Sequence, residues 1–131
     1  MRNRRFRAIT CAIAALMLVG TQFATAAFAD DGREVRKHGL CSGAALWQME
    51  AEDEGARLEL EFDVNSSIAG QEWRVKLRHD GEVFTRVIKT TNSHGNFEVD
   101  RSVYDGLGAD ALGARAVNVG SGEVCEGHVT I

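Results

Sequence analysis

The stretch RLELEFDV, residues 57–64, decides the fold, because apolar and charged side chains alternate along it without interruption. Successive side chains of a β-strand point to opposite faces, so this stretch has one dry face and one wet face. The dry face consists of Leu58, Leu60, Phe62 and Val64. We therefore expect a strand here that covers a core on one side.

The segment immediately before this strand also alternates, whereas the residues nearer the N-terminus do not. The apolar positions of the preceding segment are Ala45, Trp47, Met49 and Ala51, and residues 53–55 (DEG) supply a turn between the two segments. Residues 30–40 (DDGREVRKHGL) are polar and follow no clear period, so we predict that they form a flexible N-terminal arm. The folded domain is accordingly predicted over residues 41–131.

A hairpin is predicted after the central strand. Trp73, Val75 and Leu77 alternate with basic residues, and Asp80-Gly81 follows at once. Asp-Gly between two alternating runs favours a type I′ turn, because glycine tolerates a positive φ. We expect the return strand over about residues 82–91.

A two-residue loop also predicts the pairing of this hairpin. The expected pairs are Leu77 with Phe84, Val75 with Arg86, and Trp73 with Ile88. In this register Arg86 points inward, which conflicts with a dry inner face. The conflict disappears if the strand lies at a sheet edge, where an inward charge prevents pairing with another sheet.

The rest of the chain predicts an all-β sandwich. Further alternating segments are separated by turns rich in glycine, asparagine and aspartate, and the chain contains no proline. About seven short antiparallel strands in about 90 residues are typical of a β-sandwich. Because Trp47 and Trp73 fall into the aliphatic set of their strands, we expect both indoles to be buried on facing sheets.

The first 29 residues have the organisation of a signal peptide. Several arginines precede an apolar run over residues 8–19, and residues 27–29 (AFA) match an A-x-A cleavage site. The apolar run has about 12 residues, whereas a helix that spans a bilayer needs about 20. We therefore predict cleavage after Ala29, a secreted protein that begins at Asp30, and no stable membrane insertion.

The cysteines support an extracellular location. Cys11 lies inside the apolar run, and we expect it to be removed with the signal peptide. Cys41 and Cys125 nearly bracket the predicted domain, and an exported pair in such positions favours one structural disulfide. A redox role is disfavoured, because the chain has no C-x-x-C motif that would lower the pKa of a thiol.

Length and charge exclude several classes of partner. A chain of 131 residues that loses its signal peptide forms one domain, and we expect a monomer. The formal net charge is −4, and loss of the basic signal peptide makes the mature chain more acidic. This balance argues against nucleic acid or anionic lipid as the main partner.

The sequence shows no motif for catalysis or metal binding. The histidines are scattered, and no pair has the i, i+2 or i, i+4 spacing that places two rings on one face. Zinc needs three or four converging ligands. We expect His38, His79 and His94 to be solvated, and His128 to lie on the outer side of the last strand. No G-x-S-x-G motif is present, so we predict no catalytic residue, no metal and no cofactor.

Three stretches, CSGAALW, GQEWRVKLRHDGEVF and ARAVNVGSGEVCEGHVTI, resemble a group of small secreted actinobacterial proteins. The resemblance covers nearly all of the mature chain and implies an immunoglobulin- or fibronectin-III-like sandwich with no particular activity. Trp73 matches the buried tryptophan of immunoglobulin-like domains. The usual disulfide positions on the second and sixth strands are occupied by Leu60 and approximately Ala116. In such sandwiches the first and last strands can run side by side and parallel, which implies that Cys41 lies near Cys125.

One surface is a candidate for binding a partner. Arg74, Lys76 and Arg78 form an outward basic stripe on one strand. In the expected register, the residues beside this stripe are Val83, Thr85 and Val87. A face of this kind can bind an acidic or amphipathic partner, whereas an ordinary solvated face is the alternative interpretation.

These observations favour a non-catalytic extracellular binding module, whose partner is an extracellular protein or a component of the cell envelope. One alternative is a secreted inhibitor of a protease or another hydrolase, which would present a rigid loop over residues 105–113. A weaker alternative is a small secreted hydrolase.

Overall fold

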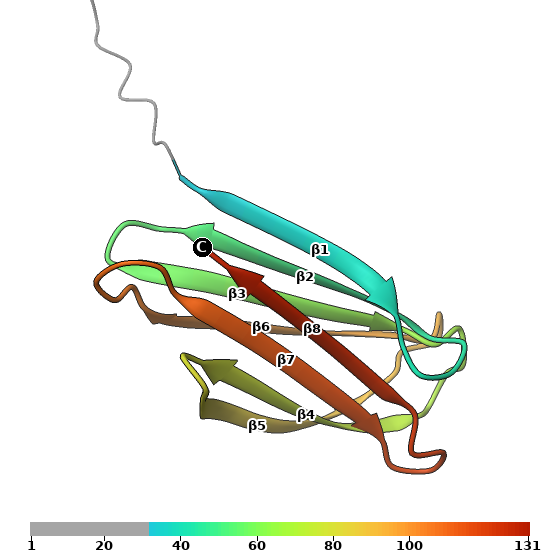
Figure 1. Ribbon diagram of the computed structural model, residues 1–131. Helices are drawn as coiled ribbons and strands as arrows, with labels where there is room; N and C mark the ends of the chain where they lie inside the picture. Colours follow the sequence, from blue (N-terminus) through green and yellow to red (C-terminus); the bar gives the residue numbers. More distant parts are fainter. Residues whose placement is uncertain (1–31) are drawn as a thin grey trace, which may run out of the picture.

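The computed structural model describes residues 32–131, which form eight β-strands and no helix (Figure 1). The strands are β1 (Glu34–Leu40), β2 (Leu46–Asp53), β3 (Arg57–Asn65), β4 (Glu72–His79), β5 (Glu82–Thr90), β6 (Asn96–Tyr104), β7 (Ala111–Asn118) and β8 (Val124–Thr130). Within these residues there is no helix that could cross a membrane. The predicted signal peptide and its cleavage site lie outside the described residues.

The strands form two antiparallel sheets with four strands each. The first sheet has the order β1-β2-β3-β6 and the second has the order β5-β4-β7-β8. The two sheets are the layers of a sandwich in Figure 1, and β2 and β8 run in the same direction on the same side of it. The all-β sandwich predicted from the sequence is confirmed, with eight described strands instead of about seven.

Strand β1 replaces most of the predicted flexible arm. It pairs with β2 along its whole length, from Glu34 opposite Glu52 to Leu40 opposite Leu46. Because β1 is an edge strand, even its inward residues Val35 and Gly39 are only half-buried. The prediction of an arm over residues 30–40 was therefore wrong from Glu34 onward: a strand with solvent near both faces does not need the alternation that marks a buried one.

The core lies between the two sheets. The alternation in residues 57–64 is confirmed, since all four apolar side chains of β3 are buried. Trp73 of β4 is fully buried and packs against Phe97 of β6, with ring centroids 5.9 Å apart. The tryptophan of β4 thus joins the second sheet to the first.

Trp47 of β2 is less buried than the sequence predicted. Its indole lies at the open side of the sandwich, between Gly39 of β1 and Gly127 of β8. A Cβ atom at Gly39 would lie 2.9 Å from the indole, and one at Gly127 would lie 2.6 Å from it. Both glycines therefore make room for a ring that packs against the core from its border.

The predicted disulfide is confirmed. Cys41, which follows β1, is bonded to Cys125 of β8, with a Cα–Cα distance of 4.3 Å. The backbone N–H of Ser42 donates to Val124 O, and the N–H of Val124 donates to Ser42 Oγ, both at 2.8 Å. The covalent bond and these hydrogen bonds join the connection between β1 and β2 to the opposite sheet.

The β4–β5 hairpin has the predicted turn and a different register. Asp80 and Gly81 have φ values of 48° and 86°, as a type I′ turn requires. A β-bulge lies between Leu77 and Arg78. The bulge leaves Phe84 as an extra residue on β5, where it packs against the core.

This bulge corrects the expected position of Arg86. Val75 pairs with Val87, and Arg86 pairs with Lys76 on the outer face. The prediction that Arg86 points inward was wrong, because a one-residue shift exchanges the two faces of a strand. The shift places Val87 on the inner face and a further cation outside, while Lys89, which pairs with the buried Trp73, takes the inward position on this edge strand.

Candidate functional site

The outer face of the second sheet carries a row of cations. Lys76 of β4 lies between Arg86 of β5 and Arg115 of β7 in the strand pairing. Arg74 and Arg78 flank Lys76 along β4. Like charges directly opposite one another in a sheet are destabilising, so the fold alone does not account for this arrangement. We call these five residues the basic face.

The structure removes two of the six residues of the predicted partner face. Arg74 and Lys76 are exposed, and Arg78 is half-buried beside Val83. Val87 pairs with Val75 and packs against the core, and Thr85 pairs with the buried Leu77. The prediction that Thr85 and Val87 lie beside the basic stripe was therefore wrong. The same one-residue shift that moves Arg86 to the outer face moves these two residues to the inner face.

Two residues that the sequence analysis placed inward belong to this surface. Arg86 is exposed, and Ile88, which is 58% exposed, pairs with Arg74. Together with Lys76 they line a shallow hollow of about 320 Å³. Ile88 therefore supplies apolar surface beside the basic face, and Val83, nearer the turn of the hairpin, supplies a smaller part of it.

Most of the positive charge on this face is unpaired. Arg115 contacts Glu126 of β8 at 3.3 Å, which neutralises the β8 side of the row. Among residues 32–131 the structure gives no ion pair for Arg74, Lys76, Arg78 or Arg86. The β4–β5 half of the face is therefore available to an anionic partner.

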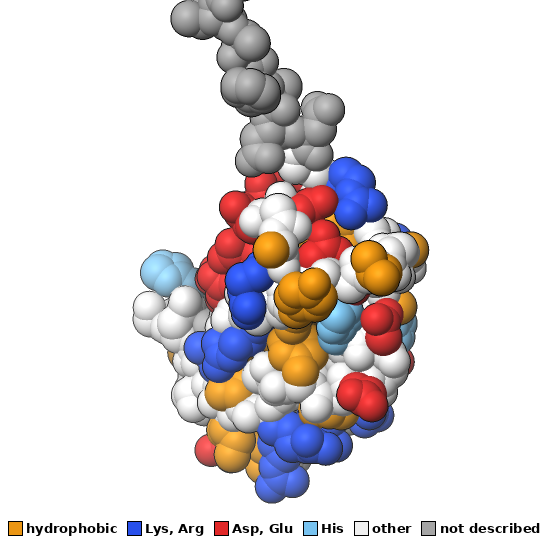
Figure 2. All heavy atoms as spheres, turned by 90° about the vertical axis from the view of Figure 1, so that its left-hand side faces the viewer, with side chains coloured by type: hydrophobic (Ala, Val, Ile, Leu, Met, Phe, Trp, Pro, Cys, Tyr) orange, Lys and Arg blue, Asp and Glu red, His pale blue; other side chains and the backbone are white. Residues whose placement is uncertain are grey.

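The outer face of the first sheet has the opposite sign. Glu50, Glu61 and Asp100 lie next to one another across β2, β3 and β6, and Asp63 pairs with Glu98. Burial and a hydrogen bond with Asp63 raise the pKa of Glu61 from its ordinary value of 4.5 to about 7. Figure 2, which views one end of the sandwich, shows acidic side chains gathered at the upper left and basic ones along the lower edge.

A further hollow of about 600 Å³ lies at one end of this acidic sheet. Its lining includes the exposed Leu40 and Leu46, with His38, Gln48 and Asn65 around them. This hollow was not predicted from the sequence, because Leu40 belongs to the strand that was predicted as an arm.

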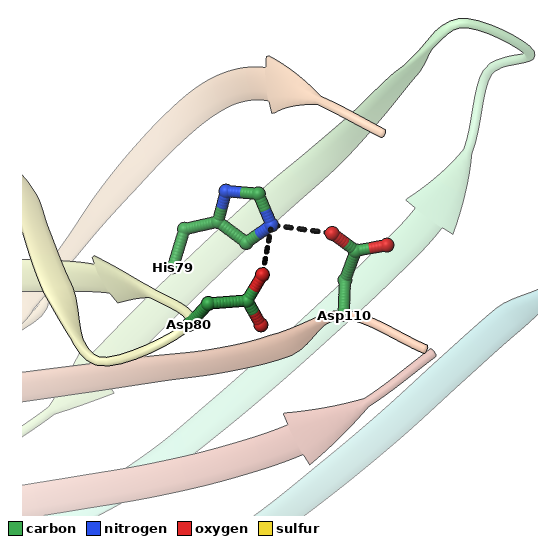
Figure 3. Close-up of side chains that lie close together, drawn as sticks. All are labelled: His79, Asp80 and Asp110. Carbon is green, nitrogen blue, oxygen red and sulfur yellow. Dashed lines mark hydrogen bonds and ion pairs between the residues drawn. The ribbon is translucent and has the colours of Figure 1, made fainter. Parts of the chain in front are cut away.

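His79 is not the solvated histidine that the sequence predicted. Its side chain is 22% exposed, and Nε2 is hydrogen-bonded to Asp110 Oδ1 (Figure 3). The same nitrogen lies 3.4 Å from Asp80 Oδ2. His79, at the end of β4, pairs with the buried Leu112 of β7, so its side chain is on the inner face of the sheet. His38, His94 and His128 are exposed, in keeping with the prediction.

Asp110 organises the loop between β6 and β7. It is 1% exposed, and its Oδ1 accepts a hydrogen bond from the N–H of Gly106 at 3.3 Å. The hydrogen bond with His79 holds the pKa of Asp110 below its usual range, against the effect of burial. The other oxygen, Oδ2, is buried without a hydrogen-bond partner in the described residues.

Asp105 adds a further carboxylate to this group. Burial raises the pKa of Asp105, and contact with the carboxyl group of Asp110 raises it further. His79, Asp80, Asp105 and Asp110 thus gather at one end of the sandwich, which we call the histidine–aspartate cluster. No spacing rule could have found it, because His79 and Asp110 are 31 residues apart and meet only through the pairing of β4 with β7.

The loop of the inhibitor alternative is shorter than predicted. The loop was predicted over residues 105–113, whereas residues from Ala111 onward belong to β7. Leu107 in the remaining loop is completely exposed. The loop therefore carries one large apolar side chain into solvent and is held at its end by the buried Asp110.

Comparisons of the chain with protein-family models, with curated proteins and with solved structures found no match.

Proposed function

We propose that the protein is a non-catalytic extracellular binding module that binds an anionic partner through the basic face. The observation that carries this proposal is the cross-strand row of Arg86, Lys76 and Arg115. Three adjacent cations repel one another in the free protein. An anionic partner removes this repulsion, so the unfavourable arrangement becomes favourable in the complex.

The chemistry of the row suits carboxylate or phosphate groups at regular spacing. Neighbouring strands lie about 4.8 Å apart, so the row presents cations at that interval. The planar guanidinium groups of Arg74 and Arg86, which have no ion-pair partner among residues 32–131, can bind carboxylates or phosphates through two hydrogen bonds each. Ile88 supplies exposed apolar area beside them.

A capture experiment with immobilised poly-L-glutamate tests this proposal. The variant Lys76→Ser/Arg86→Ser should bind about fivefold more weakly, because each of the two exposed charges contributes about 0.5 kcal/mol. The salt dependence of binding should also become flatter. The matched control is Lys37→Ser/Arg101→Ser, which removes two exposed cations from the first sheet. Equal capture of both variants would contradict the proposal.

We also infer that the sandwich is immunoglobulin-like and that the protein is secreted after loss of residues 1–29. Counting β2 to β8 as seven strands, the second pairs with the fifth and the third with the sixth, as in immunoglobulin-type sandwiches. Leu60 and Ala116, at the usual disulfide positions, are buried. The Cys41–Cys125 bond is compatible with an oxidising compartment. Intact mass of the secreted protein tests the cleavage site.

A secreted hydrolase inhibitor is a second candidate, favoured by Leu107 alone. A fully exposed leucine on a loop between two strands resembles an inhibitor residue offered to a pocket. Stoichiometric inhibition of an extracellular protease, lost in Leu107→Ser, would support this candidate. The weaker alternative of a small hydrolase stays a prediction of the sequence analysis.

A further inference from the structure

We propose that His79, Asp80 and Asp110 of the histidine–aspartate cluster bind a divalent transition-metal ion, with zinc as the ion that fits best. The proposal is independent of the basic face. It rests on converging donor atoms, on the almost complete burial of one of the carboxylates, and on an excess of carboxylates beside one imidazole.

Three donor atoms converge from three parts of the fold. His79 ends β4, Asp80 lies in the turn after it, and Asp110 precedes β7 (Figure 3). One nitrogen or oxygen atom of each residue lies within 4.8 Å of the others. Neighbouring ligands around tetrahedral zinc are about 3.3 Å apart. The 3.4 Å between His79 Nε2 and Asp80 Oδ2 matches this separation.

The second observation is the state of Asp110. Its carboxyl group is almost completely buried, and Oδ1, the oxygen that faces His79 in Figure 3, is the atom that would bind the ion. Buried charges in proteins are paired or coordinate metals, so a metal ion is a suitable partner for this carboxylate. The ion would replace the hydrogen bond between Asp110 and His79, and the displaced proton would pass to solvent.

The third ligand is held in place by the backbone. Asp80 has a left-handed conformation, and its Oδ1 accepts a hydrogen bond from the N–H of Ala111 at 2.9 Å. This bond directs Oδ2 of the same carboxylate toward His79. The Asp80 side chain is 58% exposed, so an ion can enter from solvent and keep a water ligand. Partners that fix a ligand in this way commonly raise metal affinity.

The local charge and the donor types select the class of ion. Asp80 and Asp110 both contact the imidazole of His79, and Asp105 is hydrogen-bonded to Asp110. This excess of negative charge attracts a cation. An imidazole nitrogen favours zinc and its neighbours, whereas calcium takes six to eight oxygen ligands. Three protein ligands and an open position suit zinc better than calcium.

Isothermal titration of the disulfide-bonded protein with zinc chloride tests the site. We expect one zinc ion per chain, and His79→Gln should weaken its binding more than about tenfold. Asp110→Asn should have a similar effect, and circular dichroism shows whether each variant is folded. Since His79 is partly exposed, its variant keeps the test valid if Asp110→Asn does not fold.

The chain offers a matched control in its other histidine–carboxylate pair. His128 Nε2 lies 3.1 Å from Glu126 Oε1 on β8, where both side chains are exposed and supply only two donors. His128→Gln should leave zinc binding unchanged. The proposal is overturned if the wild-type protein does not bind zinc, if His79→Gln binds as well as the wild type, or if calcium competes equally with zinc.

Discussion

At the scale of single residues, Glu61 shows that the acidic outer face of the first sheet lowers the stability of the folded state. Burial and contact with Asp63 raise its pKa to about 7, so ionisation of Glu61 destabilises the folded state. This residue adds stability at a pH below 4.5, and the contribution is lost as the pH rises through about 7. Acidity of the outer face thus opposes folding near neutral pH.

The variant Glu61→Gln should therefore be more stable than the wild type at pH 8 and equally stable at pH 4. We expect a gain below about 1 kcal/mol, because solvent screens a partly exposed group. Thermal unfolding at both pH values measures it. Glu126→Gln is the control of opposite sign, since the hydrogen bond with His128 lowers the pKa of Glu126. A Glu61 variant that is less stable at pH 8 would show that the charge helps the fold.

A second residue-scale prediction concerns the indole of Trp47. In Gly127→Ala, the new Cβ atom would lie 2.6 Å from the ring, so the ring or β8 must move. We expect a loss of about 1–3 kcal/mol in the free energy of unfolding, the usual cost of overpacking. Urea denaturation measures this loss. In the control Gly120→Ala, the nearest atom would lie 3.4 Å away and the loss should be small. Equal stability of both variants would mean that Trp47 does not fill this gap.

At the scale of strands, the sequence predicted a strand most accurately where one of its faces is buried. The alternation in β3 and in the first part of β4 follows directly from a core on one side. Strand β1 was missed, because an edge strand carries polar residues at inward positions such as Lys37. The β4–β5 register was missed because a bulge depends on packing of Phe84, which no local pattern encodes. The contact between His79 and Asp110 could not be predicted either, because it depends on the pairing of β4 with β7.

Amide hydrogen exchange distinguishes the paired strand β1 from a flexible arm. Because β1 pairs with β2 on one side only, alternate amides of residues 34–40 should be protected and the others should exchange rapidly. Nuclear magnetic resonance resolves these amides individually. Rapid exchange throughout residues 34–40 would favour the flexible arm and contradict the pairing.

At the scale of the whole molecule, one covalent bond closes most of the domain. The Cys41–Cys125 disulfide joins residues with a sequence separation of 84. Closure of such a loop contributes about 4–5 kcal/mol in the chain-entropy model. Reduction should therefore lower the melting temperature markedly in calorimetry. The double variant Cys41→Ala/Cys125→Ala should melt at that lower temperature with or without reductant. A melting temperature unaffected by reduction would show that packing alone holds the sandwich together.

The sandwich as a whole separates most of its charges: carboxylates predominate outside one sheet, where Arg36 pairs with Glu50, and cations predominate outside the other, where Glu126 pairs with Arg115. The central claim is that the basic face is the binding surface. Titration of the isotope-labelled protein with poly-L-glutamate at low salt, followed by nuclear magnetic resonance, tests it most directly. We predict that saturable shift changes centre on residues 74–78, Arg86 and Arg115, leave residues 59–63 unaffected, and disappear as salt is added. No saturable change, or changes centred on another surface, would contradict the claim.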